Sequence, residues 1–452
     1  MDSEGTQNTN DIKEPQIIKE KQTYLKSKPR YEILDGLRGV ASITIILFHI
    51  FETIVIGQPS EQIINHGYLA VEFFYVLSGF VIGYAYDDRW NRMSLWDFFK
   101  RRLIRLHPMV IAGTFTGFSF YIFQQQNKNF PLIDNVELYK FILHLIMSLL
   151  MIPCPTSLDI RGWGETNAFN GPNWTLTYEY LSNILYALIF RFFNIIGLII
   201  LVIIGAALII ILSFNLDFLD LFSEGREAQK YTVIGGWSLT VDQMFIGFTR
   251  LIYPFFIGYL IYRLQFKIKI KFGFIICSFI LICVLCCPRI GGISIFNSFY
   301  ESIAIIIIFP LIVMMGAGSI IENEKIKILN KFLGEISYPI YITHYPLIYL
   351  QIAWFYNNEN KIKIFHKVIS TIAIVIYSII ASYGWLKVYD EPVRKWLTGK
   401  FLYKKIEKKK NENVKINENK NEEKEDKSES DKLKENLNKN DVPGEELGIK
   451  DD

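Results

Sequence analysis

The sequence has little of what defines a secreted disulfide-rich domain or a nucleotide-binding α/β domain. It contains only five cysteines, and four of them, Cys277, Cys283, Cys286 and Cys287, lie within or at the end of one apolar segment. Thiols in such surroundings act as small hydrophobic side chains, so we assign them no metal or redox role. The sequence also lacks a glycine-rich phosphate loop, a strand–helix alternation and a repeat of fixed period. We therefore expect no bound metal, no permanently bound cofactor and no nucleic-acid partner.

Apolar residues are abundant and occur in blocks. Hydrophobic residues make up 51% of the chain and its mean hydropathy is positive, more than a soluble domain of this length needs for its core. Each block is about long enough for a helix to cross roughly 30 Å of hydrocarbon. The sequence therefore predicts an all-α, polytopic membrane helical bundle with about ten transmembrane helices, over residues 39–57, 68–86, 106–123, 174–193, 194–213, 245–262, 272–287, 297–316, 338–356 and 367–388.

The distribution of basic residues predicts the orientation. Arginines and lysines crowd residues 87–105, and basic segments also occupy 263–271 and 394–405. The positive-inside rule places all three in the cytoplasm, which requires an even number of crossings. The short apolar segment 141–153 ends in prolines, so we expect a re-entrant or interfacial helix there. The protein should then lie in the cytoplasmic (inner) membrane with both termini in the cytoplasm.

The two ends of the chain are polar. Residues 1–30 contain no apolar segment, so we expect a cytoplasmic N-terminal segment and insertion directed by the first span. Residues 399–452 are rich in Lys, Glu, Asp and Asn, and we expect a disordered cytoplasmic tail. Residues 31–398 would form the membrane domain.

The first span carries two groups that hydrocarbon penalises. Arg38 and His49 are 11 residues apart, so they share one helix face, with His49 about 16 Å deeper in the membrane. Histidine is suited to proton transfer near neutral pH, and an ionisable group inside a membrane indicates function. The alternative is structural: His49 would pack between helices and Arg38 would extend to the headgroups. Their shared face favours a functional pair.

A second cationic cluster lies near residue 100. Arg102 and Arg105 are three residues apart and share a helix face. Guanidinium groups suit a polyanion such as the phosphates of a nucleotide-like co-substrate. The alternative is simple anchoring of the next helix in the cytoplasm. Because Arg38 opens at the same membrane face, we expect an anion site at the end of a passage leading to His49.

Two later segments add polar groups to the spans. Glu179 lies one turn into the helix that begins near "GPNWTLTYEY", where the helix dipole stabilises a carboxylate, and Trp174 is typical of an aromatic belt. In "SYPIYITH" (337–344), Tyr341 and His344 share a face. Further candidates for lining or supporting the site are Asp35, Glu72, Tyr338 and Arg250, the last with no partner evident from the sequence.

Six motifs in this order resemble the acyltransferase 3 family of integral membrane acyltransferases. They are "LDGLRG" with the Arg-x10-His spacing of Arg38 and His49, "VEFFYVLSGFVI" (71–82), the Arg-x-x-Arg of Arg102 and Arg105, "NWTLTYE" (173–179), "SYPIYITH" and "EPVRKWL" (391–397). The resemblance covers roughly residues 31–398. One departure is Glu72, which stands where the family usually has an aspartate.

The resemblance implies transfer of an acyl group, usually acetyl from acetyl-CoA, to a hydroxyl of a cell-envelope glycan or lipid-linked sugar. His49 matches the residue regarded as catalytic in the family, and Arg38, Arg102 and Arg105 match those tied to acyl-CoA binding. Acyl-CoA would be a co-substrate, membrane lipids would surround the domain, and succinyl or other short chains remain alternatives to acetyl.

We expect His49 to act as general base, with Glu179 or another buried carboxylate orienting its imidazole. A covalent acyl-His49 intermediate is equally compatible with these residues. The main alternative is a proton-coupled transporter in which His49, Glu179, His344 and Arg250 form a relay. A third is a scaffold protein acting through its charged tail.

Overall fold

The chain is described here from a computed structural model. The structure describes residues 28–403 except 56–60, 125–128, 219, 221, 223 and 359–360. The predicted polar segment 1–30 and tail 399–452 therefore lie mostly outside the described residues. The chain divides into two compact units, Met1–Val393 and Arg394–Asp452, and the contacts discussed below lie within the first.

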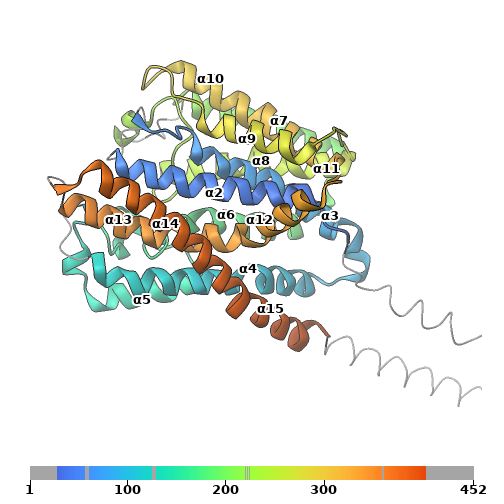
Figure 1. The fold of residues 1–452 in the computed structure, drawn as a ribbon. Coiled ribbons are helices and arrows are strands. Elements are labelled where there is room, and N and C mark those ends of the chain that lie inside the picture. Colours follow the sequence, from blue (N-terminus) through green and yellow to red (C-terminus); the bar gives the residue numbers. More distant parts are fainter. Residues whose placement is uncertain are drawn as a thin grey trace, which may run out of the picture. The chain divides into compact units, whose positions relative to one another are not determined.

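The described residues are helical and contain no strand, which confirms the predicted all-α class. Short 3₁₀ and π segments join or interrupt the α-helices (Figure 1). In chain order the α-helices are α2 (Glu32–Ile54), α3 (Ala70–Tyr86), α4 (Leu95–Tyr121), α5 (Leu138–Leu150), α6 (Asn173–Leu188), α7 (Ile195–Ser213), α8 (Val241–Leu264), α9 (Gly273–Cys286), α10 (Ile295–Ile303), α11 (Phe309–Gly318), α12 (Glu324–Thr343), α13 (Tyr345–Asn357), α14 (Ile364–Gly384) and α15 (Glu391–Thr398).

Among the residues that the structure describes, seven helical segments are long and apolar enough to cross a membrane: Glu32–Ile54, Gly67–Arg92, Leu95–Gln124, Ile195–Ser213, Val241–Leu264, Ile295–Gly318 and Ile364–Leu402. The other three predicted spans correspond to shorter or interrupted helices. α6 has 16 residues, α9 has 14, and the predicted span 338–356 is divided between α12 and α13. The count of ten therefore stays a prediction. α5 has 13 residues, about 20 Å, which is too short to cross as a straight helix.

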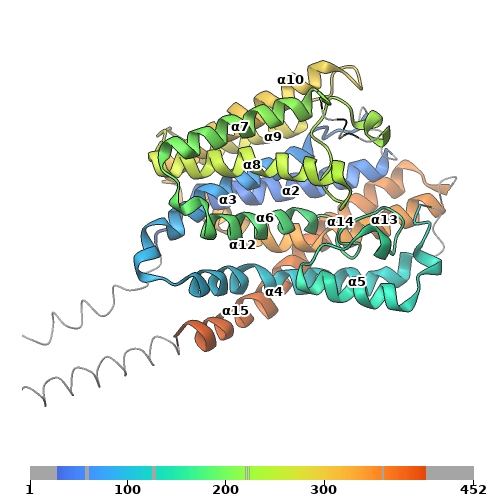
Figure 2. The same cartoon turned by 180° about the vertical axis from the view of Figure 1, so that it is seen from behind.

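Glycines allow the central helices to approach closely. A Cβ on Gly79 of α3 would collide with the backbone oxygen of Phe255 in α8, and one on Gly258 of α8 would collide with that of Val76. Small residues at helix interfaces are a common means of packing in membranes, because van der Waals contact between backbones replaces the hydrophobic effect. Figures 1 and 2 show α3 and α8 side by side from opposite directions.

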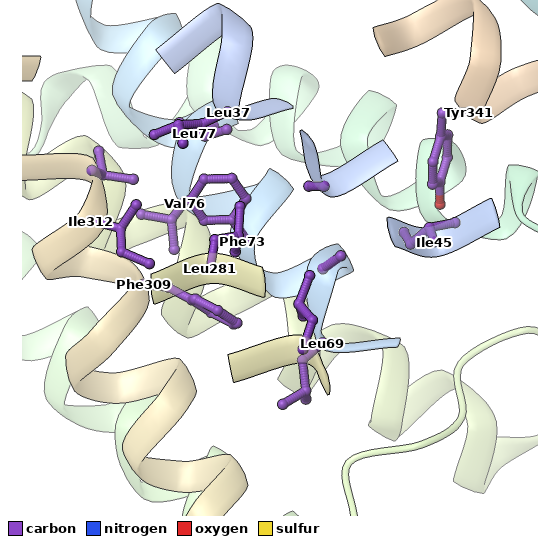
Figure 3. Packing of buried hydrophobic residues seen from close by; sticks show 14 of the residues in the cluster. Leu37, Ile45, Leu69, Phe73, Val76, Leu77, Leu281, Phe309, Ile312 and Tyr341 are labelled. Carbon is purple, nitrogen blue, oxygen red and sulfur yellow. The ribbon is translucent and has the colours of Figure 1, made fainter. Parts of the chain in front are cut away.

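The first unit has a large apolar core beside the polar face of α2. Figure 3 shows part of it, with side chains contributed by α2, α3, α9 and α11. Leu37, Leu69, Phe73, Val76 and Leu77 are among its fully buried members. Arg38 and His49 are both partly exposed, whereas Ser42 and Ile45, which lie between them on the same helix face, are buried.

A helix break positions residues around His49. α12 ends at Thr343, α13 begins at Tyr345, and Pro346 lies in the first turn of α13. Proline has no backbone N–H, so Pro346 cannot donate to the backbone oxygen of Ile342 four residues earlier, which explains why the predicted continuous span is interrupted here. Both helices pack against α2, so the break places His344 and Tyr345 beside His49, in the C-terminal half of α2.

Candidate active site

His49 is paired with an acidic residue on its own helix. Its Nδ1 lies 3.0 Å from Oε2 of Glu52, one turn further along α2. A carboxylate can only accept a hydrogen bond, so Nδ1 carries the proton and Nε2 keeps its lone pair. The side chain of His49 is 19% exposed. This tautomer makes Nε2 the atom that could accept a proton from a substrate.

Three aromatic rings surround the imidazole. The ring of His344 stacks on that of His49 with centroids 5.6 Å apart and planes inclined by 26°. Tyr345 presents its edge at 4.8 Å, and Phe48 lies at 5.0 Å. His49 therefore faces α12 and α13, which agrees with the prediction that this side chain points into the bundle.

His344 is held rigidly beside it. Its Nδ1 donates to the backbone oxygens of Ile340 and Tyr341, both at 3.0 Å, because the carbonyls of the last turn of α12 can only accept. Nε2 of His344 is buried and has no partner among the described residues. The imidazole is therefore in a single tautomer, stacked against His49.

The three predicted arginines gather near the N-terminal half of α2. Arg102 donates to Oε1 of Glu179 at 2.9 Å, and Ser78 donates to the same oxygen at 3.2 Å. Arg38 interacts with Asp35 at 3.4 Å. The charges of Arg102 and Arg38 both act on the guanidinium of Arg105, whose residue is exposed. Arg105 is therefore an accessible cation among the three, without an ion pair among the described residues.

Glu179 does not contact His49 in this structure. The prediction gave it the role of orienting the imidazole, but its carboxylate is bound to Arg102 and Ser78. The carboxylate beside His49 is Glu52, which the sequence analysis missed. The signal was present: Glu52 follows His49 by three residues, the spacing that brings side chains together on a helix.

Arg250 has a partner, contrary to the impression given by the sequence. It forms a buried ion pair with Glu72 of α3, and its Nη1 and Nη2 also donate to the backbone oxygens of Gly235 and Tyr68 at 2.9 and 3.0 Å. Its guanidinium carbon lies 5.1 Å from the ring centre of Trp174. With these bonds satisfied, the pair supports the packing of α3 on α8 and offers little to a proton relay.

The aromatic candidates occupy separate positions. Trp174 is only 9% exposed and packs beneath Arg250, so it is buried in the protein and is not a residue of a lipid-facing belt. Tyr341 shares a hydrogen bond of 2.7 Å with the hydroxyl of Thr175. Tyr338 donates to the backbone oxygen of Leu106 at 2.7 Å. Tyr341 and Tyr338 therefore join α12 to α6 and α4, respectively.

His66, in the connection between α2 and α3, is a buried histidine outside the candidate site. It is 1% exposed, and its Nδ1 donates to the backbone oxygen of Cys287 at 2.8 Å. Burial lowers the pKa of His66 to about 4. Its ring is 4.6 Å from that of Tyr300. The residue links the connection before α3 to the end of α9.

No group of three or more His, Cys, Asp or Glu within the described ranges is placed to hold a metal ion. The arrangement instead offers a base, its carboxylate partner and a set of cations on the same or neighbouring helices. These parts can hold an anionic molecule near α4 and move a proton near the end of α2.

Seven apolar helices of spanning length define an integral membrane protein. Residues 31–386 match the acyltransferase 3 family, described as an acyltransferase domain. The chain belongs to this family, which confirms the resemblance found in its motifs.

Individual relatives are similar over parts of the chain. "Protein 2 in picA locus" of Rhizobium radiobacter is 30% identical over 164 residues, which are 35% of this chain and 81% of that protein. "O-acetyltransferase OatA" of Staphylococcus aureus (strain NCTC 8325 / PS 47) is 38% identical over 87 residues, 18% of this chain and 13% of OatA. "Acyltransferase MdmB" of Streptomyces mycarofaciens is 26% identical over 167 residues, 36% of this chain and 40% of MdmB. No solved structure matches the chain.

Proposed function

We propose that the chain is a membrane O-acyltransferase that uses acyl-CoA on the cytoplasmic side to acylate a hydroxyl of a cell-envelope carbohydrate on the outer side. The observation that carries the proposal is the His49–Glu52 pair, which leaves Nε2 of His49 as a base on the same helix as Arg38. Arg38 lies beside Arg102 and Arg105, where the diphosphate of CoA can be bound.

The reaction needs one proton to move from the acceptor to the leaving group. Nε2 of His49 takes the proton from the acceptor hydroxyl as its oxygen attacks the thioester carbonyl carbon. A C–O bond forms, the C–S bond breaks, and the imidazolium returns the proton to the CoA sulfur. Glu52 stabilises the imidazolium while it exists, in the role that a carboxylate has in other histidine-dependent acyl transfers. The arginines contribute by holding the donor in place.

The donor group that we propose is acetyl. The name of the OatA relative supports O-acetylation, and that of MdmB supports acyl transfer in general. Both similarities cover only part of those proteins, so succinyl or another short acyl chain remains the alternative donor. Transfer through an acyl-His49 intermediate uses the same residues and differs only in the order of the two steps.

The membrane orientation follows from charge. Arg89, Arg92, Arg101, Arg102 and Arg105 lie before or within the first turns of α4, which favours a cytoplasmic position for this end of the bundle. The N- and C-termini would share that side in the inner membrane. His49, about 16 Å further along α2 than Arg38, would lie between the donor on the inner side and the acceptor on the outer side.

The test is complementation of a deletion strain. Cells lacking the gene would receive the wild-type chain, His49→Ala, Arg105→Ala or the control His366→Ala, which changes a histidine near the start of α14. Mass spectrometry of the envelope glycans would look for a fixed acyl mass increment at matched protein levels. We expect the increment with wild type and His366→Ala only. Full acylation by His49→Ala would overturn the assignment.

A further inference from the structure

Tyr345 lies beside His49. It is the first residue of α13, its side chain is only partly buried, and its ring meets the imidazole of His49 edge-on at 4.8 Å. Its ring is also 4.7 Å from that of Tyr349, one turn further along α13. Tyr345 is thus the tyrosine in contact with the proposed base.

The hydroxyl of Tyr345 lies under the influence of two carboxylates. The charges of Glu52 and Glu165 act on it, and the opposite charge of Arg161 acts on it as well. Glu52 belongs to α2, and Glu165 to the connection between α5 and α6. A Cβ placed on Gly171 would lie 2.8 Å from Oε1 of Glu165 and 2.9 Å from Cε1 of Tyr345. The connection therefore packs against Tyr345 directly.

The neighbouring Tyr349 has a structural role and differs from Tyr345 in this respect. It is fully buried and donates to Oε1 of Glu165 at 2.7 Å. Its ring lies 3.6 Å beneath the guanidinium carbon of Arg161, which is also fully buried. These three residues hold the connection onto α13. The hydroxyl of Tyr345, by contrast, has no hydrogen-bond partner among the described residues.

A hydroxyl on a partly exposed side chain beside a proposed base, with no partner among the described residues, is suited to a substrate. Its acidic neighbour Glu52 is 40% exposed, so a second hydrogen-bond acceptor is within reach of the same molecule, which favours a ligand rich in hydroxyl groups.

We propose that Tyr345 binds the acceptor, and that the acceptor ring held there is a hydroxyl-rich sugar. This inference rests on the proposed O-acyl transfer and adds the acceptor subsite to it. The hydroxyl of Tyr345 hydrogen-bonds one acceptor hydroxyl and thereby holds the reacting one against Nε2 of His49. Tyr345 keeps its proton throughout, because the proton of the reacting hydroxyl moves to His49 and then to the CoA sulfur.

The experiment measures how much of the acetyl group of acetyl-CoA is transferred to glycan and how much is transferred to water. Purified protein would be added to membranes from the deletion strain, which hold the native acceptor, together with acetyl-CoA labelled in the acetyl group. Label incorporated into envelope glycan reports transfer, and label released as free acetate reports transfer to water. Tyr345→Phe keeps the ring that packs on His49 and removes only the hydroxyl. Tyr377→Phe is the matched control, because Tyr377 is an exposed tyrosine of α14.

We expect Tyr345→Phe to lower glycan labelling about tenfold, the effect of one lost hydrogen bond, with acetate release and CoA binding unchanged. Tyr377→Phe should match wild type in all three. Unchanged glycan labelling by Tyr345→Phe would overturn the inference. A parallel loss of CoA binding would also overturn it, since the hydroxyl would then serve the fold. Labelling by His49→Ala equal to wild type would instead defeat the proposed function.

Discussion

Nδ1 of His49 donates its proton to the carboxylate of Glu52 at 3.0 Å, so the helix that carries the base also carries its orienting group. A second pair three residues apart lies nearer the start of α2, where Arg38 interacts with Asp35 at 3.4 Å. In the His49–Glu52 pair, Nε2 of the imidazole is left free to accept a proton. In the Arg38–Asp35 pair, the guanidinium carries a positive charge. α2 therefore presents an imidazole nitrogen and a guanidinium on one face, as the proposed function requires.

Glu52→Gln should lower the turnover number of acyl transfer by about tenfold to a hundredfold. Glutamine can still accept a hydrogen bond from Nδ1, but it cannot offset the positive charge of the imidazolium. The KM for acyl-CoA should not change, because in the proposed mechanism the arginines, and not Glu52, hold the donor. Steady-state kinetics on reconstituted protein would measure both. Glu61→Gln, in the connection after α2, is the control, and an equal loss there would refute a specific role for Glu52.

Glu179→Gln should act on the donor instead. Its carboxylate holds Arg102, so its loss frees that guanidinium from its fixed position. We expect a several-fold weaker affinity for CoA, in the range of one partly buried ion pair, and an unchanged pH profile of turnover. Titration with CoA and a pH–rate series would separate the two effects. A shifted pH profile would indicate that Glu179 acts on His49, which would contradict its contacts with Arg102 and Ser78.

The sequence predicted the face shared by Arg38 and His49 because helix periodicity is a local property. The predicted start of the first span at residue 39 was seven residues late, since α2 begins at Glu32. The apolar pattern excludes Glu32 and Asp35 because they are charged. They lie in the first turn of α2, where the helix dipole favours acidic side chains. The pattern of apolar residues thus finds a helix but not its ends.

The ion-pair partners of the charged residues could not be predicted from helix periodicity. Arg250 and Glu72 are 178 positions apart, and their pairing depends on how α3 packs against α8. The break at His344 likewise moved Tyr345 next to His49, although the two lie on different helices. Pro346 was the available signal for that break. Long-range pairings follow from packing, which a single sequence does not specify.

Arg250→Met should destabilise the protein by about 3–5 kcal/mol, because it leaves Glu72 buried without its partner. The double variant Arg250→Met with Glu72→Leu removes both charges and should recover much of that loss. Thermal unfolding in detergent would measure the three proteins side by side. Arg289→Met, a half-buried arginine before α10, is the single-variant control. A double variant no more stable than Arg250→Met would show that the pair is not the source of the stability.

His66 should make the fold sensitive to acid. Its pKa is about 4 in the folded chain and near 6.5 when unfolded, so the unfolded state binds more protons between these values. Stability is therefore retained above pH 6.5 and falls as the pH decreases from 6.5 to 4. His66→Asn keeps a donor for the backbone oxygen of Cys287 and cannot be protonated in this range. The melting temperature of His66→Asn should fall less than that of wild type between pH 7 and pH 4.5, whereas His366→Asn should follow wild type. Equal acid sensitivity of His66→Asn and wild type would show that protonation of this buried ring does not limit stability.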